Sequence, residues 1–148
     1  EVQMDLGSGS GASDLDVRVA ALEEQMPACL SEDPEGTAVF EGCNVQIVNG
    51  EGATGTMNGK GNLIIGYNES FLGEGKDRSG SHNLVVGPEH QYSGSGGLVA
   101  GYNNTISGFW STVTGGAYNS ASANGATVIG GFRQTSSTEN GIAPSLDP

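Results

Sequence analysis

Positive charge is scarce in this sequence of 148 residues, which holds five Lys and Arg residues against 17 Asp and Glu. The net charge is −12, and residues 1–52 alone carry eleven acidic residues with Arg18 as the single basic one. A protein that binds DNA or RNA needs a basic face for the phosphates. We therefore expect no nucleic-acid partner.

Long hydrophobic runs are also missing. No stretch of about 18 apolar residues occurs, so we expect no membrane insertion by this segment. Apolar residues make up 35% and aromatic residues 6%, too little for a compact monomeric core, whereas Gly occupies 26 positions. So much glycine is typical of disorder or of a repetitive fold with many tight turns. The evenly spaced apolar pairs favour the repetitive fold.

Catalytic and cofactor motifs are absent as well. His82 and His90 are the only histidines, and neither has a second metal ligand at a suitable spacing. Residues 50–55 match a dinucleotide fingerprint by letter, but the residues that follow cannot open the helix that it needs. Residues 31–42 begin like a calcium loop but end in Gly instead of Glu. We expect a protein with no enzymatic activity, no cofactor and no metal.

Cysteine is limited to Cys29 and Cys43. Two thiols at this spacing, without a CxxC motif, favour a disulfide formed in an oxidising compartment, within a chain or between chains. A reduced pair in a cytosolic protein is the alternative. The predicted location is therefore extracellular or at the cell surface.

The N-terminal third divides into three zones. Residues 1–13 are predicted to be a flexible leader, residues 14–27 a helix that Pro27 ends, and residues 28–43 an acidic connector. Apolar residues follow heptad spacing along the helix at Leu15, Val19, Leu22 and Met26. Fewer than two heptads do not hold as an isolated helix. The pattern predicts either a surface helix packed on its own domain or, as we favour, a short coiled-coil collar at a trimer seam.

The remainder of the chain contains a repeat. Each apolar run ends in a glycine, in steps of 21, 14, 14 and 15 residues, at Gly66, Gly87, Gly101, Gly115 and Gly130. A second column follows the start of each run by eight or nine residues, at Phe71, Tyr92, Ile106, Ala121 and Ser136. Seven extra residues within "LGEGKDRSGSH" lengthen the first step and keep the phase. We predict a β-roll over residues 44–137, with a degenerate first coil, and a flexible tail over residues 138–148.

A coil of 14 residues has room for two short strands and two tight turns. It then offers only two or three inward apolar side chains, so the coils must stack on one another. Three chains side by side would bury more surface. The sequence thus predicts an all-β protein, a trimeric parallel β-roll.

Four segments carry a resemblance to a known family: "HNLVVGPEHQYSG", "GGLVAGYNNTISG", "STVTGGAYNSASA" and "GATVIGGFRQTSS". The apolar strand that ends in Gly and the Asn/Ser-Ala step after it resemble the head repeats of trimeric autotransporter adhesins, the YadA-like head. The resemblance implies a left-handed parallel β-roll in a homotrimer. It also implies a secreted or cell-surface fibre head that binds a protein or glycan on a host or prey surface.

Candidate binding residues lie where the repeat is interrupted. The inserted loop is the most highly charged stretch of the C-terminal half, with Glu74, Lys76, Asp77 and Arg78. These residues are expected either to bind a ligand from a rigid scaffold or to form salt bridges within the loop. Phe109 and Trp110 fall at a turn where neighbouring repeats have small residues. Trp110 is expected either to pack between chains or to stay exposed and stack on a sugar or a protein.

Two other functions fit the same pattern. A receptor-binding tail fibre of a phage or contractile injection system is built from similar trimers. An ice-binding β-solenoid would explain the rows of Thr and Ser, although it requires a regular Thr array and the matching positions vary among Thr, Val and Ala.

Overall fold

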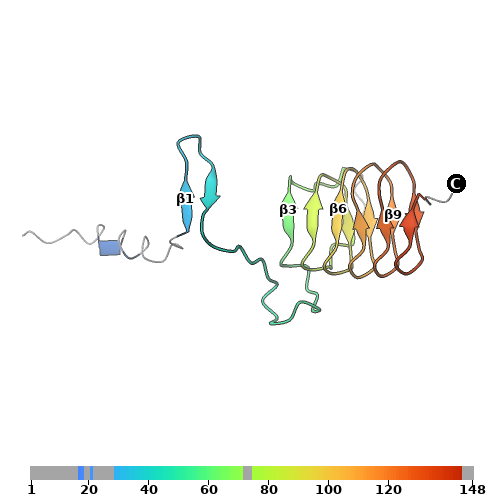
Figure 1. Cartoon of the computed structure of the whole chain (residues 1–148), viewed down its shortest axis with the longest axis horizontal. Helices are drawn as coiled ribbons and strands as arrows, with labels where there is room; N and C mark the ends of the chain where they lie inside the picture. Colours follow the sequence, from blue (N-terminus) through green and yellow to red (C-terminus); the bar gives the residue numbers. More distant parts are fainter. Residues whose placement is uncertain (1–16, 19–20, 22–28, 72–74, 145–148) are drawn as a thin grey trace, which may run out of the picture. The chain divides into compact units, whose positions relative to one another are not determined.

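The protein consists of two compact units, Glu1–Val45 and Gln46–Pro148. This division lies close to the boundary that the sequence predicts between residues 43 and 44. The computed structural model describes several segments of these units, whose course Figure 1 shows: residues 17–18, 21, 29–71 and 75–144.

Of the predicted helical collar, the structure describes Val17, Arg18 and Ala21, which are helical. Its four seam positions, Leu15, Val19, Leu22 and Met26, lie outside the described residues. The other regular elements of the described part are short β-strands. No helix in that part is long and apolar enough to cross a membrane.

The first unit contains an antiparallel hairpin of β1 (Leu30–Glu32) and β2 (Ala38–Phe40). Asp33 holds its turn, because Asp33 Oδ1 accepts hydrogen bonds from the backbone N–H groups of Glu35 (3.1 Å) and Thr37 (2.7 Å). The Asp33 carboxylate, which lies within the calcium-like stretch of residues 31–42, therefore serves the turn of the hairpin.

A disulfide between Cys29 and Cys43 closes this hairpin, with a Cα–Cα distance of 6.0 Å. The predicted disulfide is confirmed, and it forms within one chain. Closing a loop of this length stabilises the folded state by about 3 kcal/mol in the chain-entropy picture. A two-stranded hairpin is marginal by itself, so the crosslink compensates for the small core of this unit.

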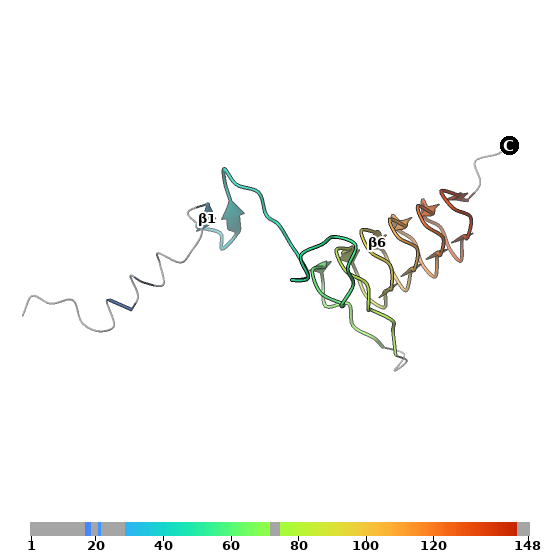
Figure 2. The same ribbon diagram turned by 90° about the horizontal axis from the view of Figure 1, so that it is seen from below.

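The second unit is a parallel β-solenoid in which the chain alternates between two sheets (Figure 1, Figure 2). The six-stranded sheet contains β3 (Leu63–Ile65), β4 (Leu84–Val86), β6 (Leu98–Ala100), β8 (Thr112–Val113), β10 (Thr127–Val128) and β12 (Ile142–Ala143). The four-stranded sheet contains β5 (Gln91–Tyr92), β7 (Thr105–Ile106), β9 (Ser120–Ala121) and β11 (Thr135–Ser136). Neighbouring strands are parallel in both sheets. The predicted all-β class and parallel roll are confirmed.

The strand register follows the repeat that the sequence predicts. In the six-stranded sheet, Leu63 pairs with Leu84, Leu84 with Leu98, Leu98 with Thr112 and Thr112 with Thr127. The second predicted column pairs in the same way from its second member onward, through Tyr92, Ile106, Ala121 and Ser136. The inserted residues therefore leave the register intact.

The core of the roll is a narrow double column. The six-stranded sheet contributes buried valines at Val85, Val99, Val113 and Val128. The four-stranded sheet contributes Tyr92, Ile106, Ala121 and Ser136, all at most 5% exposed. The second column shrinks from tyrosine to serine, so the C-terminal coils bury less apolar surface and gain less from it.

A further buried column is polar. Asn119 Nδ2 donates to the carbonyl oxygens of Gly115 (3.0 Å) and Gly131 (3.1 Å), and its Oδ1 accepts from the Gln134 N–H (2.8 Å). The Asn119 N–H donates in turn to Asn104 Oδ1 (2.8 Å). Asn104 Nδ2 donates in the same way to the carbonyl oxygens of Ala100 and Gly116. Asn104 and Asn119, which we call the asparagine ladder, thus each join their own turn to the next coil.

The roll differs from the prediction at both ends. The degenerate first coil expected before β3 does not form strands: residues 41–62, all described, contain none, and Met57 is 45% exposed. The many glycines in this segment favour bends over strand pairing. Phe71, the first member of the predicted second column, is also exposed and lies outside the strands. At the other end, β12 lies beyond residue 137, in the expected tail, because Ile142–Ala143 pairs with β10 and buries Ala143.

Replacing Asn119 with Ala should destabilise the roll, because the backbone groups that it binds would lose their partners. An unsatisfied buried polar group costs about 1–3 kcal/mol, so we expect the free energy of unfolding in urea to fall by roughly 2 kcal/mol or more. Ser122→Ala, at an exposed position after β9, is the control and should change it by less than about 0.5 kcal/mol. An N119A variant as stable as the wild type would contradict a structural role for the ladder.

Candidate functional site

Two rows of turn residues with left-handed backbone run along the roll and define its rims. The turns that leave the six-stranded sheet form the loop-side rim, with positive φ at Glu89, Asn103, Tyr118 and Arg133. The turns that enter this sheet form the tryptophan-side rim, with positive φ at Gly61, His82, Gly96, Trp110, Gly125 and Asn140. Gly and Asn adopt this conformation readily, whereas another residue costs about 1–2 kcal/mol. Large side chains on the rims are therefore held there at the expense of stability.

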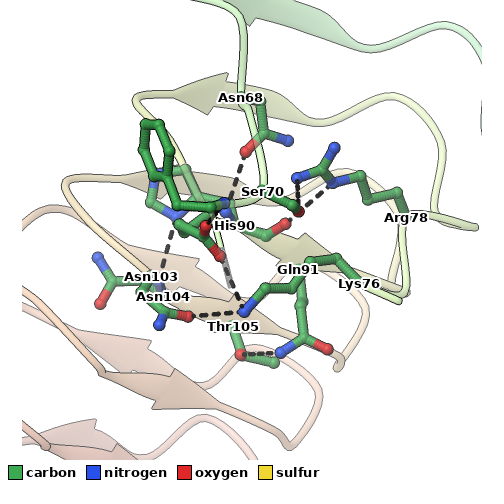
Figure 3. Close-up of polar contacts among 11 residues, drawn as sticks. Asn68, Ser70, Lys76, Arg78, His90, Gln91, Asn103, Asn104 and Thr105 are labelled. Carbon is green, nitrogen blue, oxygen red and sulfur yellow. Dashed lines mark hydrogen bonds and ion pairs between the residues drawn. The ribbon is translucent and has the colours of Figure 1, made fainter. Parts of the chain in front are cut away.

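A buried ion pair ties the inserted loop to the loop-side rim. Lys76 Nζ lies 3.2 Å from Glu89 Oε2, with the two side chains 8% and 0% exposed. Lys76 also donates to Asn103 Oδ1 (3.1 Å), as Figure 3 shows. The other carboxylate oxygen of Glu89 accepts a hydrogen bond from the N–H of Phe71. The loop therefore contacts two successive coils and is fixed against them.

Of the next two charged residues of the loop, Arg78 anchors the loop to the roll and Asp77 is exposed to solvent. Arg78 donates from Nε to the carbonyl oxygen of His90 (3.2 Å) and from Nη2 to Ser70 Oγ (3.1 Å) (Figure 3). Asp77 is exposed. Hydrogen bonds from the hydroxyl and the N–H of Ser79 hold the pKa of the Asp77 carboxyl below its usual value. Asp77 thus presents a stable negative charge to solvent.

Of the loop residues expected to bind a ligand, some anchor the loop and one is exposed to solvent. The structure brings Lys76 and Arg78 onto the rim as anchors and leaves Asp77 in solvent, whereas Glu74 lies outside the described residues. The partner of Lys76 is Glu89, on the following coil. This partner could not be predicted from the sequence, because the two residues meet only when the coils stack.

His90 takes the position of an asparagine in the ladder and is fully buried. Its Nε2 lies 3.0 Å from the carbonyl oxygen of Val86, and its Nδ1 lies 3.2 Å from the N of Asn104. Because the Asn104 N–H donates, these contacts assign the imidazole proton to Nε2. Burial, the largest cause, lowers the pKa of His90. The neutral ring therefore supplies one N–H donor and one acceptor nitrogen at a position where the amide of Asn119 donates two hydrogen bonds and accepts one.

Phe109 and Trp110 lie together on the tryptophan-side rim, with ring centroids 6.0 Å apart. Trp110 is 68% exposed and has a φ of 58°. The indole lies over Gly96, where an added Cβ would approach Trp110 Cδ1 to 3.1 Å. The two rings line a shallow pocket of about 350 Å³ together with Thr54, Gly55 and Ser95. The pair therefore forms an aromatic surface open to solvent in the single chain.

His82 has a structural role near the start of the roll. Its Nδ1 lies 3.0 Å from the carbonyl oxygen of Thr54, and its Nε2 lies 3.3 Å from the N of Asn49. These contacts tie the looped segment before β3 to the tryptophan-side rim. Over the part of the chain that the structure describes, no three His, Cys, Asp or Glu side chains are grouped so as to hold a metal ion.

An aromatic cluster that the sequence did not reveal lies on the loop-side rim. Tyr118 packs edge to face against Tyr102 and Phe132, with ring centroids 5.7 Å and 5.5 Å apart. The guanidinium carbon of Arg133 lies 5.1 Å from the Phe132 centroid and 5.9 Å from that of Tyr118. The available signal was the short motif after the glycines, "YN", "AYN" and "FR". The position of its aromatic residue relative to the glycine shifts by one residue between coils.

Compared with protein-family models, with curated proteins and with solved structures, the chain matches none of them. The function is therefore inferred from the sheet faces and the rims.

Replacing Glu89 with Gln should release the inserted loop, because Lys76 would remain as a buried cation without its carboxylate. We expect trypsin to cleave after Lys76 at least about tenfold faster in native conditions, since the loop would open more often. Glu69→Gln, at an exposed position on the neighbouring coil, is the matched control and should leave the cleavage rate unchanged. Equal cleavage of E89Q and the wild type would show that the ion pair does not hold the loop.

Replacing His90 with Asn should remove a pH dependence of stability. Because burial lowers the pKa of His90 below its usual 6.5, the unfolded chain binds the proton more readily than the folded chain. The contribution of His90 is therefore complete above about pH 6.5 and is lost as the pH falls below it. A proton on Nδ1 would also face the Asn104 N–H.

Urea unfolding of the wild type and H90N between about pH 7.5 and pH 5 measures this effect. The wild type should lose stability relative to H90N as the pH falls. His82, Lys76, Arg78, Glu89 and Asp77 are present in both proteins, so the difference between the two curves reports on His90 alone. Parallel curves would show that His90 is not protonated differently in the two states.

Proposed function

We propose that this protein is a non-enzymatic, trimeric, extracellular fibre head, similar to an adhesin, that presents a multivalent binding surface. The observation that carries the proposal is the contrast between the outer faces of the two sheets. One outer face is mostly apolar, and the other is rich in hydroxyl groups. A large apolar face on a protein surface is typical of an interaction site.

The outer face of the six-stranded sheet supplies the apolar surface. Side chains alternate along a strand, so the residues that flank the buried valines of β4 and β6 point outward, as do those that flank Ile64, the partner of Val85 in β3. On the first three strands these outward residues are Leu63, Ile65, Leu84, Val86, Leu98 and Ala100. Leu63 and Ile65 are 46% and 54% exposed. Thr replaces the leading leucine on β8 and β10, whereas Ile129 and Ile142 keep exposed apolar side chains at the C-terminal end of the sheet.

The outer face of the four-stranded sheet is polar throughout. Its leading outward residues are Gln91, Thr105, Ser120 and Thr135. These polar side chains are well hydrated, so this face is expected to stay in contact with solvent. The row also lacks the uniform Thr spacing that an ice-binding solenoid requires.

These two faces and the narrow core support the proposed trimer. Each coil buries only about two inward side chains, so contact between chains would add apolar burial that the single roll lacks. Three rolls around one axis would cover their six-stranded sheets and leave the polar faces and both rims in water. The left-handed winding that the resemblance implies and the helical collar that the heptad spacing predicts belong to this proposal.

The contact surface proposed for a partner lies on the rims. Asp77 on the anchored loop and the Phe109–Trp110 pair are its candidate residues, and Lys76 and Arg78 position the loop. Trp110 combines positive φ with an exposed indole, and neither feature stabilises the roll, which supports a role in recognition. Three copies of a weak site raise avidity without tight individual contacts. The proposed partner is a protein or glycan on a host or prey surface.

Replacing Leu98 with Glu should separate the trimer, because it places a charge in the middle of the apolar face. Light scattering should give the wild type about three times the chain mass of 15.0 kDa and L98E about one chain mass. Thr105→Glu, an outward residue of the neighbouring strand in the other sheet, is the matched control and should remain trimeric. A monomeric wild type would overturn the trimer.

The same three proteins test the binding role. On an array of glycans and matrix proteins, the wild type and T105E should be retained. L98E should be retained about a hundredfold less, because its avidity is lost. If no surface retains the wild type, the adhesin-like role is wrong. Equal retention of L98E and the wild type would exclude multivalent binding.

A further inference from the structure

We infer that the aromatic cluster on the loop-side rim, formed by Tyr102, Tyr118, Phe132 and Arg133, is a binding site for a saccharide that carries a carboxylate. The cluster is separate from the Phe109–Trp110 pair and from the exposed part of the inserted loop. The inference rests on the proposed function, because it names the chemical class of ligand that the fibre head would hold.

The aromatic rings form a platform that the chain itself leaves open. Tyr118 and Phe132 are 42% and 58% exposed. In the stacked turns, Ala117 pairs with Tyr102 on one side and with Phe132 on the other. The small Ala117 side chain leaves room for the Tyr118 ring between its two aromatic neighbours. A pyranose packs its C–H face on such rings, while the tyrosine hydroxyls can bond to its own hydroxyl groups.

Arg133 adds a cation whose donors are available. Among the described residues, none forms a hydrogen bond or an ion pair with its guanidinium, which lies beside the rings of Phe132 and Tyr118. The other basic side chains on this rim, Lys76 and Arg78, are engaged with the roll. A guanidinium binds a carboxylate through two parallel hydrogen bonds. Arg133 is therefore suited to hold the acid group of a sugar that lies on the rings.

The local charge permits an anionic ligand even though the chain carries a net charge of −12. Residues 1–52 account for −10 of this charge, and residues 53–148, with six acidic and four basic residues, account for −2. Glu89 is the one carboxylate in the row of rim positions, and Lys76 pairs with it. Carboxylates of the rim would therefore not strongly repel an anionic ligand bound near Arg133.

The backbone conformation at two of these side chains also supports the inference. Tyr118 and Arg133 have φ angles of 60° and 55°, and Asn103 occupies the same rim position one coil earlier. Asparagine tolerates this conformation, whereas bulky side chains are strained by it. Two strained and exposed positions in successive coils, next to each other, are typical of a functional site.

Calorimetric titration with two matched saccharides tests the inference. Methyl glucuronide and methyl glucoside share a pyranose ring and differ in a carboxylate against a hydroxymethyl group. The wild type should bind the glucuronide at least about tenfold more tightly, because only it can pair with Arg133. R133N should abolish this preference, and Y118N should weaken both saccharides. Both variants introduce Asn, and Asn103 already occupies the equivalent turn position with the same backbone conformation. The fold should therefore be retained.

Three outcomes would overturn the inference. Equal affinities of the wild type for the two saccharides, or a preference that persists in R133N, would remove the carboxylate pairing. Acetate that binds as tightly as the glucuronide, with no effect of Y118N, would indicate a simple anion site. Binding of an acidic peptide without binding of the glucuronide would assign the cluster to a protein partner.

The monomeric L98E variant separates this inference from the proposed function. It should bind the glucuronide with the affinity per chain of the wild type, because Leu98 lies on the outer face of the six-stranded sheet and the cluster lies on a rim. Glucuronide binding by a wild type that proves monomeric would support the site and reject the trimer. A trimeric wild type that is retained on the array but ignores the glucuronide would support the fibre head and overturn the site.

Discussion

Hydrogen bonds between stacked coils are the constraint on which this structure depends, because no coil has enough apolar surface to fold alone. Each coil buries about one residue from each sheet, such as Val99 and Ile106. The parallel strands bond each coil to the next, and the asparagine ladder adds side-chain bonds at the turn through Asn104 and Asn119. In-register stacking places equivalent residues above one another, so a residue that suits one coil suits its neighbours. The period of the sequence is a direct result of this geometry.

The same constraint explains how the roll accommodates its irregular parts. The inserted loop leaves the register unchanged because it bulges from a turn, and it is then held by Lys76, Glu89 and Arg78. His90 can stand in the asparagine ladder because a neutral imidazole has one donor and one acceptor. Both irregularities lie on the loop-side rim, next to the turns that carry the aromatic cluster. Variation is thus confined to turns, which is compatible with the recognition role that we propose for the rims.

What the sequence predicts and what it misses follow from the same geometry. The strand register, the inward columns and the disulfide could be predicted, because the first two repeat in every coil and the two cysteines have no other partner. The Lys76–Glu89 pair could not, because its residues belong to different coils and follow no period. The aromatic cluster could not be predicted, because the residue in register with Tyr102 in the next coil is Ala117, and Tyr118 lies one residue further along. The end coils deviate because each has a neighbour on one side only, so that local composition decides between strand and bend.

The taper of the inward column from Tyr92 to Ser136 has a mechanical consequence. Each coil resists peeling in proportion to the apolar surface that it shares with its neighbour, so the last coils are the most weakly attached. Phe132 and Arg133 belong to this weak end. A pull applied through them would open the terminal coils first and leave the coils clamped by the inserted loop closed. The roll would then yield under load at its C-terminal end while its remaining coils stay folded.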